Sequence, residues 1–200
     1  MNIICLHGFT QNKDIFNKKL SKLFNYKNLN INMHFIEGSY SINNDGFGWW
    51  IMDKENVHNI NTNLDATLYN FDESINKIKQ YILDNNLTNK NVGLIGFSQG
   101  ACLVDYLCKS QILDITIKFA IFIGGFSFDY DILPNKIKNV NIPSLHIYGI
   151  MDTVVSNKES FILKLNYKSS NQILHKKGHI IPSDSYSKTS FFNFIKVNIE

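Results

Sequence analysis

Gly96-Phe97-Ser98-Gln99-Gly100 is the stretch that decides the fold of this 200-residue chain. It follows the apolar run Val92–Ile95, which is typical of a buried strand, and it precedes Ala101–Lys109, which favours a helix. A Gly-x-Ser-x-Gly sequence between a strand and a helix predicts a sharp turn that holds the serine hydroxyl above the sheet. The context therefore predicts a nucleophile at Ser98. A glycine-rich turn with a buried serine is the alternative.

Outside this turn, strand-like and helix-like segments alternate along the whole chain, without repeats or linkers. Such alternation predicts one α/β domain over residues 1–200, with a mostly parallel sheet covered by helices on both faces. The residues from Gly38 to Asn70 are polar and dotted with glycine, and we expect a long loop there. The connection from Gly125 to Asn141 is too short for a large cap domain. Strands are expected at 2–6, 31–36, 91–95, 118–123, 144–148 and 172–175, and helices at 14–25, 71–83, 101–109, 158–165 and 184–197.

An acidic partner for Ser98 should follow a strand, because ligands of such sheets bind at the carboxyl ends of the strands. Asp152 follows the strand at 144–148 and fits the expected chain order of serine, acid and histidine. Asp129 and Asp131 follow the preceding strand and remain alternatives. Asp184 comes after the best histidine and breaks the order. A helix cap is the other role open to Asp152.

The base must be a histidine on a loop at the same edge. Of six histidines, His179 alone combines a loop position with the correct order, since Gly178–Pro182 separates the last strand from the last helix. We therefore predict His179 as the base. The others lie at the end of a strand, within a strand or in the long loop, at His7, His34, His58, His146 and His175.

Two backbone N–H groups are needed to stabilise a developing oxyanion. Gln99, directly after the nucleophile, should supply one, and Phe9, in the turn after the first strand, should supply the other. We expect His7 to brace that turn. Trp49 and Trp50, in the long loop, are predicted to line an apolar substrate pocket, although either could instead fix the loop to the core.

Composition excludes several other classes of function. The formal net charge is +3, and every basic residue is lysine. The chain therefore lacks the planar guanidinium group of arginine, which binds guanine or phosphate through two hydrogen bonds, and no nucleic-acid partner is expected. Neither a metal-ligand cluster nor a phosphate-binding glycine loop is present, so we expect no metal and no cofactor. No apolar run is long enough for stable membrane insertion. Three cysteines in core-like positions favour a cytoplasmic protein.

Several separated motifs together resemble the FSH ("family of serine hydrolases") branch of the α/β-hydrolases. They occur in the family's order: Cys5-Leu6-His7-Gly8-Phe9-Thr10-Gln11-Asn12, Trp49-Trp50, Asp72-Glu73-Ser74, Gly96-Phe97-Ser98-Gln99-Gly100-Ala101, Pro143-Ser144-Leu145-His146-Ile147 with Asp152, and Gly178-His179-Ile180-Ile181-Pro182.

The resemblance implies an α/β-hydrolase fold, a Ser98, Asp152 and His179 triad, and esterase or thioesterase activity on a small ester with an apolar acyl group. Acyl-protein thioesterases also carry Gly-Phe-Ser-Gln-Gly, so a thioesterase or lysophospholipase-like activity remains open. A silent hydrolase scaffold that binds a ligand is a further alternative.

Overall fold

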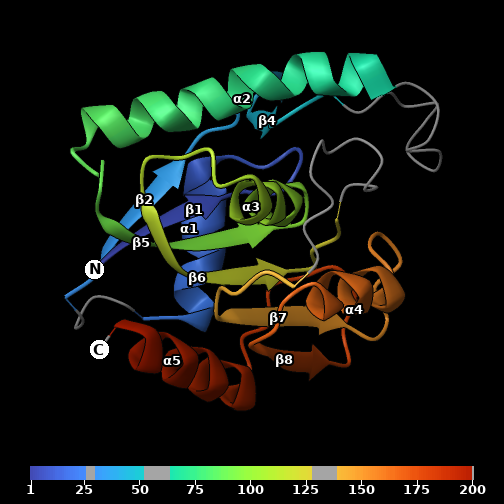
Figure 1. Ribbon diagram of the computed structural model, residues 1–200. Coiled ribbons are helices and arrows are strands. Elements are labelled where there is room, and N and C mark those ends of the chain that lie inside the picture. Colours follow the sequence, from blue (N-terminus) through green and yellow to red (C-terminus); the bar gives the residue numbers. More distant parts are fainter. Residues whose placement is uncertain (26–29, 52–63, 128–138, 200) are drawn as a thin grey trace.

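A computed structural model describes residues 1–25, 30–51, 64–127 and 139–199 of the chain, the side chains of 64–70 excepted. Among them, six strands form one sheet in the order β2-β1-β5-β6-β7-β8, and every neighbouring pair is parallel (Figure 1). The predicted α/β fold with a parallel sheet is confirmed. The strands of this sheet are β1 (Asn2–Leu6), β2 (Asn32–Ile36), β5 (Asn91–Phe97), β6 (Thr116–Ile123), β7 (Ser144–Gly149) and β8 (Ser170–His175).

Helices cover both faces of the sheet and give three layers (Figure 1). On one face, Phe71, Leu103 and Leu163 from three helices share an apolar cluster with alternate strand residues. On the other face, Phe16 and Phe191 from two helices belong to a second cluster. The helices of the first face are α2 (Leu64–Asp84), α3 (Gln99–Ser110) and α4 (Asn157–Leu165), and those of the second are α1 (Lys13–Leu23) and α5 (Ser185–Ile199).

The expectation of a structureless loop from Gly38 to Asn70 is wrong at both of its described ends. Strand β3 (Tyr40–Asn43) pairs antiparallel with β4 (Gly46–Gly48), and these strands are too short to give a readable periodicity. The hairpin is also bonded to the turn after β1, since Phe47 N donates to Gln11 O over 2.7 Å. Helix α2 begins at Leu64 rather than at Phe71, in residues free of glycine and proline.

The parallel sheet brings the ends of its strands to one edge of the molecule. The segments that follow β1, β5, β6, β7 and β8 all begin there, and they include each predicted catalytic residue. Among the described residues, no helix combines the length and the apolar character that a membrane span requires.

Candidate active site

Ser98 occupies a strained turn between β5 and α3. Its φ of 53° and ψ of −119° are unusual for a residue other than glycine. The turn is held because Ser98 N donates to Ile123 O over 2.9 Å. A Cβ atom at Gly96 or Gly100 would collide with backbone of α3 or β1, so both glycines are required by packing. Ser98 is partly exposed although the residues beside it are buried.

Asp152 and His179 form a hydrogen-bonded pair. Asp152 lies in the turn after β7, where its Oδ1 accepts from Val154 N and Val155 N over 2.9 and 3.0 Å. Its Oδ2 lies 2.7 Å from His179 Nδ1. Because a carboxylate can only accept, Nδ1 carries the proton and Nε2 keeps a free lone pair. Nε2 is buried and has no hydrogen-bond partner.

The histidine ring lies against Phe97, which precedes Ser98, and against Gly124, which follows β6. The centroids of the Phe97 and His179 rings are 4.9 Å apart. On the other side, Gly124 has a φ of 54°, and a Cβ atom there would lie 2.9 Å from His179 Cε1. No hydrogen bond joins His179 Nε2 to Ser98 in this structure. Such catalytic bonds commonly tighten only when substrate binds.

The turn after β1 contacts the nucleophile through Gly8, where a Cβ atom would lie 3.2 Å from Ser98 Cβ. The carbonyl of Gly8 accepts from His7 Nδ1 over 2.8 Å and from Gln11 N over 3.1 Å. In a trans peptide, the carbonyl and the following N–H point in opposite directions. The Phe9 N–H is therefore directed away from the His7 ring, in a turn that borders Ser98.

His7 is buried and takes one tautomer. Its Nε2 accepts from Gly38 N over 2.8 Å, so the proton lies on Nδ1, which donates to Gly8 O. Burial lowers the pKa of His7, although Glu37, 3.3 Å from Nε2, opposes this shift. The imidazole is therefore neutral near pH 7 and acts as a fixed link between the turn after β1 and the segment that enters the hairpin.

The side chain of Gln99 fastens the two tryptophans to the nucleophile turn. Its Oε1 accepts from Trp49 N, and its Nε2 donates to Trp50 O, both over 2.9 Å. Trp49 Nε1 donates to His7 O over 2.8 Å. The two indoles are buried, with exposed fractions of 0% and 3%. Trp49 thus anchors the hairpin, and contact of either indole with substrate stays a prediction.

The other acidic candidates are accounted for as follows. Asp184 caps α5, since its Oδ1 accepts from Ser187 N over 2.9 Å. The alternatives Asp129 and Asp131, and the loop histidine His58, lie outside the described residues.

The remaining strand histidines have contacts within the fold. His34 Nδ1 lies 3.2 Å from Tyr81 Oη. His146 is buried, stacked on Phe122, with its Nε2 3.0 Å from Ser144 Oγ.

Two residues that contact the site were not predicted from the sequence. Gly124 abuts the histidine ring, and the Gly124-Gly125 pair directly after a strand was a visible signal for it. His175 braces both catalytic loops: its carbonyl accepts from Ile150 N over 2.9 Å, and its Nδ1 accepts from Lys177 N over 3.3 Å. Its position within a strand gave no signal of that role.

Known proteins are similar to this chain in sequence and in fold. The model of the serine hydrolase family FSH1 matches residues 1–191. The chain belongs to this family. It is 27% identical over its full length to 75% of the esterase CG5412 of Drosophila melanogaster, and 28% identical over its full length to 95% of the esterase C25G4.2 of Caenorhabditis elegans.

A solved structure of a carboxylesterase from Mesorhizobium loti superposes with a TM-score of 0.70 at 14% identity, covering 98% of this chain and 88% of that one. This similarity shows a shared fold. The predicted FSH membership and α/β-hydrolase fold are confirmed, and the protein is a carboxylic ester hydrolase.

Proposed function

We propose that the FSH family member described here cleaves its ester through an acyl-enzyme on Ser98, with His179 as the base and Asp152 as its partner. The observation that carries this proposal is the 2.7 Å bond between Asp152 and His179 Nδ1. It leaves Nε2 unprotonated, buried and next to the strained turn that presents Ser98.

The reaction has two halves. Ser98 Oγ attacks the carbonyl carbon while its proton passes to His179 Nε2, and the oxyanion accepts hydrogen bonds from Phe9 N and Gln99 N. The first N–H groups of a helix have no partner within it, which leaves Gln99 N available. Collapse of the tetrahedral intermediate expels the alcohol, which takes the proton from His179 Nε2. Water then gives a proton to His179 Nε2 and attacks the acyl carbon. The bond from that carbon to Ser98 Oγ breaks as Oγ takes the proton back from Nε2, and the acid is released.

The proposed substrate is a small ester with an apolar acyl group. A thioester would pass through the same steps with a thiol as the leaving group, so a thioesterase or lysophospholipase-like enzyme is the closest alternative. A scaffold that binds a ligand without turnover is the other.

Hydrolysis of p-nitrophenyl esters from acetyl to long acyl chains, with matching thioesters, tests the proposal. We expect Ser98→Ala to lower kcat by a factor of about 10⁴ or more. Ser183→Ala, at an exposed serine of the same edge, is the matched control and should keep full turnover. Equal turnover in the wild type and Ser98→Ala would contradict the mechanism. A folded wild type with no turnover on any ester would favour the ligand-binding scaffold.

A further inference from the structure

Large apolar side chains project into solvent from the two loops that carry Asp152 and His179. The exposed fraction is 69% for both Met151 and Val154, although Asp152 and Val155 beside them are buried. We call this set the apolar rim, and its members are Ile150, Met151, Val154 and Ile180.

The backbone of the two loops fixes the rim in its outward position. Ile150 N donates to His175 O over 2.9 Å, and Met151 N donates to Lys177 O over 3.3 Å. A Cβ atom at Gly149 would collide with Lys177 O, so the loops are in direct backbone contact. These contacts tie the backbone that carries Ile150 and Met151 to the loop that carries His179.

Positive charge lies beside the rim. Lys176 and Lys177 are exposed on the histidine loop, and Lys158 is exposed in the first turn of α4. Two carboxylates also lie in this region: Glu159 accepts from Ser156, and Asp184 accepts from Ser187 and has its pKa lowered by those bonds and by the charge of Lys177. Within the described part of the chain, no ion pair involves any of these three lysines.

We propose that the apolar rim and its lysines dock the active site on the surface of an anionic phospholipid membrane. Shallow burial of apolar side chains at the headgroup boundary, combined with lysines near lipid phosphates, is how proteins attach without spanning a bilayer. The proposal rests on the catalytic assignment above and deepens it. Because the rim adjoins His179, the substrate class becomes esters of apolar acyl chains held in that surface.

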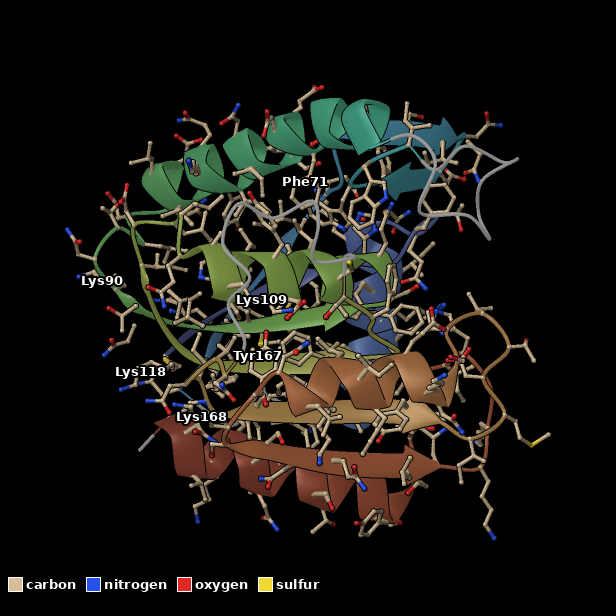
Figure 2. The ribbon with its side chains drawn as sticks, turned by 45° about the vertical axis from the view of Figure 1, so that its right-hand side comes forward. Phe71, Lys90, Lys109, Lys118, Tyr167 and Lys168 are labelled. Atoms are coloured by element: carbon tan, nitrogen blue, oxygen red, sulfur yellow. The ribbon has the colours of Figure 1, made fainter. Side chains whose placement is uncertain are left out.

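The opposite edge of the sheet supplies a matched set of lysines. Lys90, Lys118 and Lys168 lie toward the amino-terminal ends of the strands, away from the strand ends that carry the site (Figure 2). They are exposed. General attraction of a basic protein to anionic lipid would use them as readily as the lysines of the rim.

Co-sedimentation of the full chain with lipid vesicles tests docking without any need for turnover. All variants carry Ser98→Ala, so that the lipid stays intact. One set of vesicles contains phosphatidylcholine alone, and the other contains phosphatidylserine as well. The rim variant is Ile150→Ser with Met151→Ser. Its control is Val197→Ser, at an apolar side chain that is 75% exposed at the far end of α5.

We expect binding to vesicles with phosphatidylserine, a drop in the partition coefficient of about tenfold or more in the rim variant, and no change in Val197→Ser. Lys176→Gln with Lys177→Gln should weaken binding by about fivefold for each lysine. Lys118→Gln with Lys168→Gln should leave it unchanged.

Three results would overturn the proposal: no vesicle binding, equal losses in the rim variant and its control, or a rim variant that abolishes self-association instead, which would make the rim a contact between copies. Turnover of a water-soluble acetyl ester by the wild type keeps the two proposals apart. If turnover is present and vesicle binding absent, only docking fails. If turnover is absent on this ester and on every longer acyl ester of the series above, the catalytic proposal fails, whatever the vesicles show.

Discussion

The side chain of His7 fixes the orientation of the peptide between Gly8 and Phe9. The neutral ring donates to Gly8 O through Nδ1 and accepts from Gly38 N through Nε2. Gly124 has no side chain, and this leaves room for the ring of His179. In the proposed mechanism, both residues would act by positioning other groups.

Replacing His7 should impair the oxyanion site. His7→Leu removes the donor to Gly8 O, and we expect kcat to fall by about tenfold to a hundredfold with little change in KM, because loss of a whole donor costs about 10²–10³. His7→Asn keeps an N–H near Nδ1 and should recover part of the loss. Steady-state kinetics on one ester decide this. Equal kcat in the two variants would argue against a role for the Nδ1–H bond.

A methyl group at Gly124 should displace His179. In Gly124→Ala, the new Cβ lies 2.9 Å from His179 Cε1, and the positive φ adds about 1–2 kcal/mol of strain. Gly125→Ala is the matched control, because its Cβ meets Ala101 and Leu163 instead. Urea unfolding should show both variants destabilised, whereas kcat should fall markedly only in Gly124→Ala. A similar loss of kcat in both would contradict the assignment.

At the scale of elements, the β3–β4 hairpin is joined to α3 by one side chain. Gln99→Leu keeps the volume but removes the bond to Trp50 O and leaves the buried Trp49 N without its Gln99 acceptor, which should cost about 1–3 kcal/mol of unfolding free energy. Hydrogen exchange at Trp49 N should quicken as well. The backbone N–H of Gln99 is retained.

Gln172→Leu is the control, since this exposed glutamine accepts only from Tyr148 Oη at the surface. Its effect should stay within about 0.5 kcal/mol. Protection of Trp49 N that is unchanged in Gln99→Leu would show that other contacts hold the hairpin.

The sequence could predict some elements of the fold and of the site but not others. The turn at Ser98 and the positions of Asp152 and His179 were readable, because each follows a strand and parallel strands end at one edge. The hairpin was not readable, since it depends on bonds to Gln11 and to Gln99, far away in the chain. The start of α2 was readable but was missed, because Leu64 and Leu68 continue the apolar spacing of Phe71, Ile75 and Ile78 into a stretch assigned to the polar loop.

For the whole molecule, buried histidines make stability depend on pH. Burial lowers the pKa of His146 to about 3, compared with about 6.5 in an unfolded chain. Between these values the unfolded state binds a proton that the folded state does not. As the pH is lowered below about 6.5, the free energy of unfolding should therefore decrease. This residue contributes up to about 1.4 kcal/mol per pH unit to the decrease. Burial also lowers the pKa of His7, His34 and His175.

Unfolding by urea across the pH range checks this effect. His146→Gln should reduce the slope by about one proton below pH 6.5 and leave the stability above pH 7 nearly independent of pH. The same slope in the variant and the wild type would show that His146 does not contribute.

The order of the strands also sets when the enzyme becomes competent as it is made. Phe9 follows β1 and Ser98 follows β5, but His179, the proposed base, follows β8, which is the last strand of the sheet in chain order. Domains fold as units during synthesis. A nascent chain therefore presents Ser98 long before His179 exists to deprotonate it, and a product that stops short of β8 carries an unactivated serine. The proposed mechanism therefore predicts that hydrolysis begins only after β8 has docked against β7.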